Sequence, residues 1–280
     1  MIIQATLLLI GIQLNTYSLH PSLLLGECNG VVPSLLNALE LVGKKIDKIK
    51  VVANGAGAAA IACLKLYIRL GVKRKNIVLC DSKGVIRKDR DYLTKQKKQF
   101  ATSRNLKTLS DAINKSDVFM GLSVGNTVTQ KMLKTMNKNP IVFAMANPDP
   151  EISYLDAKKA RKDIIMATGR TDFPNQVNNV LGFPYIFRGA LDVRASKINE
   201  SMKLAAVRAI ATLAKEAVPE DVNLAYHGKN LSFGPEYIIP KPNDPRLITT
   251  VSIAVAKAAI KSGVAGKEIT DWDKYEEFLI

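Results

Sequence analysis

Histidine, cysteine and tryptophan are scarce in this chain of 280 residues, and their scarcity excludes several kinds of site. Its two histidines, His20 and His227, lie too far apart in the sequence for a zinc site that needs several of them. Its three scattered cysteines (Cys28, Cys63 and Cys80) are too few for a disulfide scaffold, so we expect a reducing compartment.

The chain also lacks an apolar run long enough to span a bilayer. The apolar start, residues 1–14, has an unbroken apolar core of about ten residues, whereas a spanning helix needs roughly 20. This start also lacks the basic residues that open a secretory signal. We therefore expect a cytoplasmic protein with no membrane partner.

Lysine and arginine are missing from the first 43 positions, which hold two acids, Glu27 and Glu40. The chain from Lys44 onward therefore has a net charge of +17, and the whole chain +15. Such an excess suits nucleic acid, but the cations are dispersed, and aromatic residues are not interleaved with the few short clusters, such as 95–98. A lysine-rich solvated surface, which also suits anionic metabolites and phosphates, is the simpler interpretation. A nucleic-acid partner is not expected.

With 47% hydrophobic and 23% charged residues, the composition is that of a folded globular chain. Residues 15–33 show no period of two or 3.6, whereas apolar residues from Ser34 onward follow a helical spacing that Gly43 ends. We therefore expect a divergent amino-terminal segment over 1–33, either loosely packed or outside the fold, and one domain over 34–280.

A glycine turn between two predicted strands matches a dinucleotide-binding pattern. An apolar run over 49–53 is typical of a strand, and residues 55–60 follow it as G-x-G-x-x-A. A helix is predicted over 58–70 and a second strand over 76–80, with Asp81 at the carboxyl end of that strand. This order of strand, turn, helix, strand and acid is far more specific than the glycines alone.

Each residue type in this turn has a physical reason. Gly55 allows the tight turn, Gly57 has no Cβ and lets the backbone approach a pyrophosphate, and Ala60 permits close helix–strand packing. The helix start adds N–H groups and a partial positive charge, and Asp81 is placed to bind ribose hydroxyls. The alternative is a glycine turn that only packs a helix.

The choice of coenzyme stays open at this point. Asp81 should repel a 2′-phosphate and so favour NAD. Ser82, Lys83, Arg87 and Lys88 follow closely and are suited to bind that phosphate, which favours NADP.

Strands and helices continue to alternate along the chain. Helices are predicted over 106–115, 129–136 and 155–161, and strands over 116–122, 141–146 and 164–167. This alternation predicts an α/β fold with a Rossmann-like, doubly wound parallel sheet and flanking helices. Ligands bind such sheets beyond the carboxyl ends of the strands, where the turn at 55–58, Asp81, Ser123 and Asn147 should lie. Amphipathic helices over 200–215 and 250–262 should cover the core.

Three asparagines are further candidates. Asn147 precedes a proline, so it either shapes a turn or faces a ligand. Asn178 and Asn179 lie in a predicted loop after the last strand. Their amides suit a carboxylate or hydroxyl ligand, but equally the capping of their own backbone.

From about Leu35 to about Leu279 the sequence resembles malic enzyme, most of all the bacterial type. The motifs that carry the resemblance are GAGAAAIAC at 55–63, CDSKGVI at 80–86, ANPDPEI at 146–152, TGRTDFPNQVNNVLGFPYIFRGALD at 168–192, MKLAAVRAIA at 202–211 and SFGPEYIIPKPNDPRL at 232–247. The resemblance implies an oxidoreductase that converts malate to pyruvate and carbon dioxide with NAD or NADP. It also implies a homo-oligomer and a Mg²⁺ or Mn²⁺ ion, held by carboxylates, that polarises the new C2 carbonyl.

Site residues follow from the matching motifs. The resemblance implies that the coenzyme is bound by Gly55, Ala56, Gly57, Ala58, Ala59, Asp81 and Ser123. It implies that malate and the nicotinamide riboside are contacted by Asn147, Asn178 and Asn179. Ser123 is the weaker transfer, because Val124 and Gly125 stand where the family usually has glycine and proline.

Several residues that the family needs are absent from the matching motifs. Its tyrosine acid, its lysine base and a Glu-Asp metal pair belong to a large amino-terminal domain, and the stretch before Leu35 lacks a third metal carboxylate. Tyr17 and Glu27 are candidates by residue type only. No catalytic or metal-binding residue is therefore assigned, and we expect a truncated or split form with impaired catalysis rather than one completed by another polypeptide.

Two other functions are weighed. A non-catalytic NAD(P)-binding or oligomerisation module is the main alternative. A Rossmann dehydrogenase that acts on amino acids is disfavoured by the asparagine loop and by the segment at 233–242.

Overall fold

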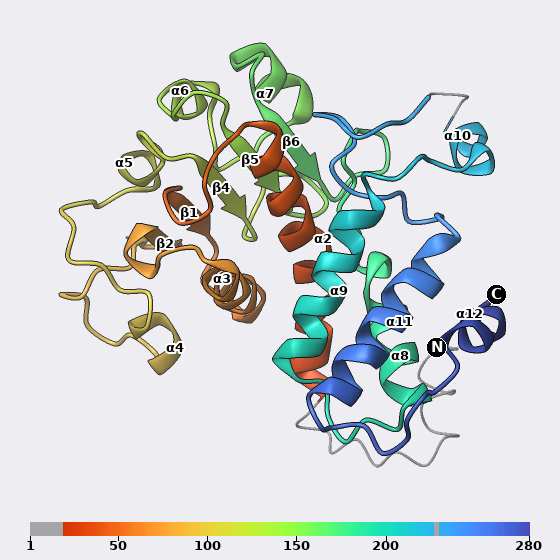
Figure 1. Cartoon of the computed structure of the whole chain (residues 1–280). Helices are drawn as coiled ribbons and strands as arrows, with labels where there is room; N and C mark the ends of the chain where they lie inside the picture. Colours follow the sequence, from red (N-terminus) through yellow and green to blue (C-terminus); the bar gives the residue numbers. More distant parts are fainter. Residues whose placement is uncertain (1–18, 227–229) are drawn as a thin grey trace.

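The computed structural model describes residues 19–226 and 230–280, without the side chains of 19–27 and 29. Tyr17 and the side chain of Glu27 lie outside these described parts. A six-stranded sheet forms the centre (Figure 1). Its strands are β1 (Val51–Asn54), β2 (Ile77–Asp81), β3 (Gly84–Val85), β4 (Val118–Gly121), β5 (Ile141–Ala144) and β6 (Ile165–Thr168). Their order is β3-β2-β1-β4-β5-β6, and only β3 is antiparallel to its neighbour. The predicted doubly wound parallel sheet is confirmed.

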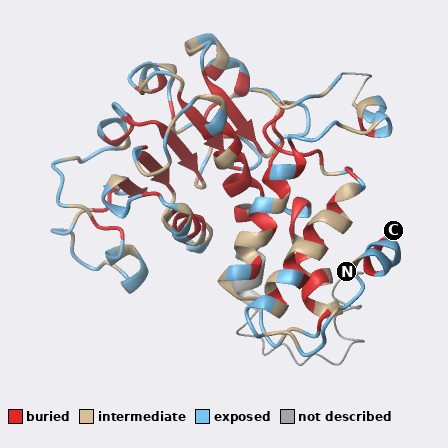
Figure 2. Ribbon diagram, in the orientation of Figure 1, coloured by how far each residue is buried: buried red, intermediate tan, exposed pale blue. Residues whose placement is uncertain are grey.

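Helices cover both faces of the sheet, so β1, β4, β5 and β6 are buried throughout (Figure 2). Because successive strand residues point to opposite faces, Val51 and Ala53 face one apolar layer and Val52 faces the other. The first layer is completed by α2 (Leu19–Leu41) and α3 (Ala58–Leu70). The second layer is completed by α5 (Leu109–Ile113), α6 (Gln130–Lys134) and α7 (Tyr154–Ala160).

The three short helices of the second layer begin at side-chain caps. The hydroxyl oxygen of Thr108 accepts a hydrogen bond from the Asp111 N–H, and the Asp111 carboxylate accepts one from the Thr108 N–H, which completes a capping box. The hydroxyl oxygens of Thr129 and Ser153 cap the next two helices by each accepting a hydrogen bond from one backbone N–H, without a full capping box. These caps fix where the chain leaves each loop at the amino ends of the helices.

Helix α2 begins much earlier than the sequence predicted. We expected a start at Ser34, but this residue lies inside the helix, as does Pro33. The side chains of Cys28, Val31 and Val32 are fully buried in the first apolar layer. The helix therefore runs through the boundary drawn at residue 33, and the division into segments at this position stays a prediction.

Gly30 accounts for this extension. A Cβ at Gly30 would overlap the side chain of Val177, so glycine lets the helix pack closely against the segment after β6. Farther along, the buried Asn37 side chain donates hydrogen bonds to the carbonyls of Ala211 and Ile238, both at 2.9 Å. These tertiary contacts outweigh the poor helix propensity of glycine and proline.

A third apolar layer lies beside the sheet and is mainly helical. It is formed by α8 (Phe183–Asp192), α9 (Glu200–Leu213), α11 (Arg246–Lys261) and α12 (Trp272–Leu279), of which α9 and α11 were predicted within a few residues. In Figure 1, α9 lies between α2 and α11. No helix was predicted at α4 (Lys95–Lys98), α8, α10 (Glu220–Ala225) or α12. In the described parts of the chain, no helix combines the length and apolar character needed to cross a membrane.

Candidate functional site

The sheet has a topological switch point between β1 and β4. The chain proceeds from β1 outward to β2 and β3, then returns to β4 and proceeds outward in the opposite direction. Such a reversal leaves a crevice at the carboxyl ends of the two central strands, and ligands of this fold class bind there. Gly55 follows β1 at this point, and Leu122 follows β4.

Gly55 occupies a position that only glycine fits. Its φ is +105°, and a Cβ would overlap the carbonyl of Leu122. The Gly55 N–H donates to the Cys80 carbonyl at 3.0 Å, and the Leu122 N–H donates to the Asn54 carbonyl at 2.8 Å. The turn is therefore fixed between the ends of β1, β2 and β4, as the sequence predicted for a tight turn.

Gly57 has a different constraint. It is the N-cap of α3 with an extended backbone (φ −77°, ψ 178°), and a Cβ there would meet no atom within 4 Å. No side chain caps this helix, and Ala58 is exposed at its start. The first turn of α3 thus presents backbone N–H groups and the positive end of its dipole to open space, which fits a diphosphate. Ala60 is buried against the sheet, as predicted.

Asp81 lies at the carboxyl end of β2 and is held by two cations. The Arg90 guanidinium donates to its two carboxylate oxygens at 3.0 and 3.2 Å, and the Lys97 ammonium donates at 2.8 Å. The Lys83 N–H donates a further hydrogen bond at 3.0 Å. Burial of the Asp81 carboxyl opposes ionisation, but these hydrogen bonds outweigh it and lower the pKa to about 2.

A pocket of about 460 Å³ opens over this carboxylate. Ser82 and Lys83 line it as the sequence suggested, together with Arg90 and Lys97, which sequence reasoning did not single out. Arg87, a candidate for the 2′-phosphate, instead pairs with Asp89. The missed residues are separated from Asp81 by a loop, so only the fold brings their charges to it.

Ser123 follows β4 and is hydrogen-bonded to the end of β1 and to the loop after β5. The Asn54 amide donates to its hydroxyl oxygen at 2.8 Å, and its backbone N–H donates to the Glu151 carboxylate at 3.1 Å. Ser123 is partly exposed, so it faces the crevice beside the Gly55 turn. The next side chain, Val124, is 66% exposed and offers an apolar surface at the same edge.

The three asparagines lie farther along the same side of the molecule. Asn147 follows β5 and is exposed, and its side chain lies 3.5 Å from the position that a Cβ on Gly169 would take, after β6. Asn178 was expected in a loop, but its carboxamide oxygen accepts from the Val180 N–H and caps a 3₁₀-helix, Asn179–Leu181. Asn179 is exposed in the first position of this helix.

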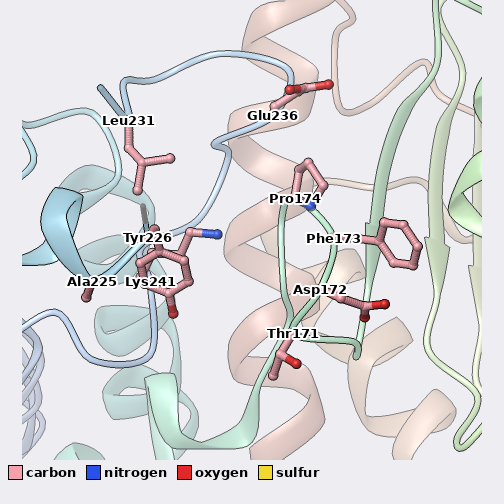
Figure 3. Close-up of a pocket in the computed structure, with 9 residues that line it drawn as sticks. All are labelled: Thr171, Asp172, Phe173, Pro174, Ala225, Tyr226, Leu231, Glu236 and Lys241. Carbon is pink, nitrogen blue, oxygen red and sulfur yellow. The ribbon is translucent and has the colours of Figure 1, made fainter. Parts of the chain in front are cut away.

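A second, smaller pocket of about 290 Å³ lies beside the loop after β6 (Figure 3). One wall is formed by Thr171–Pro174, and the facing wall carries Tyr226 and Lys241, whose ammonium lies 4.4 Å from the centre of the Tyr226 ring. Burial raises the pKa of Tyr226. Thr171–Pro174 and Lys241 lie within motifs that carry the resemblance, but the sequence did not predict that they form one pocket, because the two segments lie far apart in the chain.

A divalent-metal site has no counterpart in the described parts of the chain, where no three histidine, cysteine, aspartate or glutamate residues gather. Two carboxylates near the crevice are already engaged, Asp81 by two cations and Glu151 by backbone N–H groups. The described residues therefore fit a dinucleotide but not the Mg²⁺ or Mn²⁺ ion that the resemblance implies.

A glycine turn at the switch point, an open helix start and an acid at the end of the next strand define a Rossmann-like dinucleotide-binding domain. The family model described as malic enzyme, NAD binding domain, matches residues 26–227. This chain therefore belongs to the malic enzyme family.

Individual relatives agree with this assignment. The chain is 54% identical over 248 residues to the NADP-dependent malic enzyme of Haemophilus influenzae, a match that covers 88% of this chain and 33% of that protein. It is 50% identical over 250 residues to the NAD-dependent malic enzyme of Rhizobium meliloti, covering 89% and 32%. The crystal structure of Entamoeba histolytica malic enzyme superimposes with a TM-score of 0.79 at 36% identity, covering 91% and 51%. The chain spans about a third of the length of the two curated relatives.

Proposed function

We propose that this chain forms the coenzyme-binding part of a malic enzyme, which oxidises and decarboxylates malate to pyruvate with a nicotinamide dinucleotide. One observation carries the proposal: the Gly55 turn is closed against β4, while the space above Gly57 and the start of α3 is open. A turn that served only to pack the helix would not need that open space.

In this proposal, each half of the coenzyme has its own group of residues. The backbone from Gly55 to Ala59 (Gly55, Ala56, Gly57, Ala58, Ala59) binds the diphosphate, and Asp81 lies beside the adenosine ribose. Ser123 lies at the nicotinamide, and malate and the nicotinamide riboside are bound by Asn147, Asn178 and Asn179. The bound coenzyme supplies a hydride acceptor for C2 of malate, and the protein orients the two carbons.

We further propose that NADP is the preferred coenzyme. An acid at Asp81 repels a 2′-phosphate only while its charge is uncompensated. Here Arg90 and Lys97 both bind it, at 3.0 and 2.8 Å, and Lys83 lines the same pocket. The three cations outnumber the two carboxylates that line this pocket, Asp81 and Asp91, so the pocket keeps a net positive charge, which suits a phosphate group.

Catalysis by this chain alone is expected to be impaired. A tyrosine acid, a lysine base and metal carboxylates, all implied by the family, are not assigned to any described residue. Because a single general acid or base contributes roughly 10²–10⁴-fold to a rate, loss of both would leave very slow turnover. We therefore propose that the residues of this chain do not suffice for turnover by themselves. As the family resemblance suggests, we also propose that the protein acts in the cytoplasm as a homo-oligomer.

Calorimetry and a coupled rate assay test the proposal together. The chain is titrated with NADP and NAD, and malate-dependent coenzyme reduction is followed with Mn²⁺, with and without the separately produced amino-terminal part of a related malic enzyme. We expect coenzyme binding by the chain and turnover only with the added part.

The possible negative results of these two experiments lead to different conclusions. A folded chain that binds neither coenzyme contradicts the proposed function. Fast turnover by the chain alone contradicts the account of the missing residues. Coenzyme binding without turnover, even with the added part, supports a non-catalytic NAD(P)-binding module.

A further inference from the structure

Glu151 is a fully buried carboxylate beneath the ends of two central strands. One oxygen, Oε1, accepts a hydrogen bond from the Ser123 N–H at 3.1 Å, just after β4. The other, Oε2, accepts one from the Ala146 N–H at 3.0 Å, just after β5. A single side chain thus connects the loop that carries Ser123 to the loop that carries Asn147.

The surrounding backbone is shaped to admit this carboxylate. A Cβ on Gly121, the last residue of β4, would overlap the carboxyl group of Glu151. A Cβ on Gly125 would approach the carbonyl of Asp149 to 2.6 Å, so the two loops also meet closely there. Backbone hydrogen bonds join the loops further, from the Val128 N–H to the Glu151 carbonyl at 2.9 Å.

Burying the negative charge of Glu151 is unfavourable unless both of its hydrogen bonds, from Ser123 and Ala146, form. Burial raises the pKa of Glu151, and the N–H groups of Ala146 and Ser123 oppose that shift. A glutamine at position 151 would offer one acceptor oxygen only, and its NH₂ group would face a backbone N–H. The second N–H would then be buried without a partner, which distorts whichever loop carries it.

We propose that Glu151 is a positioning residue for the nicotinamide half of the coenzyme. It sets the separation between Ser123 and the backbone immediately before Asn147. Because the Asn54 amide joins Ser123 to the end of β1 at 2.8 Å, hydrogen bonds run continuously from the Gly55 turn to the Asn147 loop. The diphosphate turn also has a bond to β2 that does not involve Glu151, from the Gly55 N–H to the Cys80 carbonyl at 3.0 Å, so it should be disturbed less than the two loops. This inference rests on the proposed function.

The test compares Glu151→Gln with a matched control, Asp117→Asn, in the full chain. Asp117 is also a buried carboxylate that accepts a backbone N–H, from Lys50 at 2.8 Å, but it lies at the opposite, amino end of β4. Two quantities are measured. The first is the hydrogen-exchange protection of the Ser123 and Ala146 amides. The second is the dissociation constant of the preferred reduced coenzyme (NADPH or NADH) and of the matching ADP-ribose fragment, which lacks nicotinamide.

For Glu151→Gln we expect at least tenfold lower protection of one or both amides. Coenzyme binding should weaken about tenfold and fragment binding by less than twofold. Asp117→Asn should weaken neither ligand selectively, although it lowers stability. Equal weakening of both ligands, or unchanged coenzyme binding by Glu151→Gln, overturns the inference. If the unaltered chain binds neither ligand, the proposed function itself fails, and the inference fails with it.

Discussion

At the scale of single residues, Gly55 is needed for folding, whereas Gly57 is needed for coenzyme binding. Gly55→Ala places a Cβ at a φ of +105° and against the Leu122 carbonyl, so we expect it to lower the free energy of unfolding by about 2 kcal/mol or more. Gly57→Ala meets only open space and should change stability by less than about 1 kcal/mol. It should nonetheless weaken coenzyme binding at least tenfold, because its methyl group enters the space proposed for the diphosphate.

Urea unfolding and calorimetry of the two variants decide this point. The decisive variant is Gly57→Ala, since its fold should be intact. Coenzyme binding equal to that of the unaltered chain would mean that the diphosphate does not lie above this helix start.

The cations at Asp81 make a second prediction at this scale. Lys97→Ala removes one of the two charges that compensate the carboxylate, so NADP binding should weaken about tenfold while NAD binding changes less than twofold. Lys95→Ala is the control, because Lys95 is exposed on the same short helix and does not line the pocket. Equal losses for NADP and NAD in Lys97→Ala would place the 2′-phosphate elsewhere.

At the scale of elements, helix α2 depends on close contacts that its sequence pattern does not reveal. Gly30→Ala would force the helix away from Val177, so we expect a loss of about 1–3 kcal/mol in the free energy of unfolding. Gly234→Ala is the matched control, since the nearest atom to its Cβ would be 3.8 Å away. If both variants unfold at the same urea concentration as the unaltered chain, the helix before Ser34 is not packed as described.

Elements with a local signal were predictable from the sequence, and elements fixed by distant contacts were not. The five parallel strands and α3 were found because apolar runs and a glycine stop are local, whereas the two-residue strand β3 was not predicted. The extension of α2 was missed because Gly30 and Pro33 argue against a helix unless the close packing on Val177 is known. Helix α8 was not predicted, although Pro184 near its start was a usable signal.

The residues of the candidate site also divide into those that a local stretch of sequence predicts and those that only distant contacts bring together. Gly55, Gly57 and Asp81 follow from one short stretch of sequence, because the strand, turn and helix that position them are adjacent. Arg90 and Lys97 reach Asp81 only through the loop after β3, and no spacing rule predicts such a contact. The bonds of Glu151 to two strand ends likewise depend on the order of the strands in the sheet.

At the scale of the whole molecule, acid should destabilise the fold through paired carboxylates. The pKa of Asp163 is lowered to about 2, first by hydrogen bonds from Arg161, and the pKa of Asp81 is also about 2. A carboxyl whose pKa is lower in the folded than in the unfolded state stabilises the fold above its ordinary pKa of 3.8. This stabilisation is lost as the pH falls from about 4 towards 2.

Asp163→Asn isolates this contribution. The variant should unfold at lower urea concentration than the unaltered chain at pH 6, and the two midpoints should converge near pH 2. A difference that stays constant across this range would show that the Arg161 pairing does not contribute through ionisation.

The strand order has a practical consequence for engineering. The flank made of β2, β3 and α4 lies on one side of the β1–β4 junction, and β5 and β6 lie on the other. Under the proposed function, the first flank holds the residues around the adenosine ribose and can be exchanged as one contiguous segment. Replacing residues 77–107 by those of an NAD-dependent relative should change the coenzyme preference from NADP to NAD, so that the hydride ends up in the cell's NADH rather than its NADPH. The residues around the nicotinamide would stay unchanged.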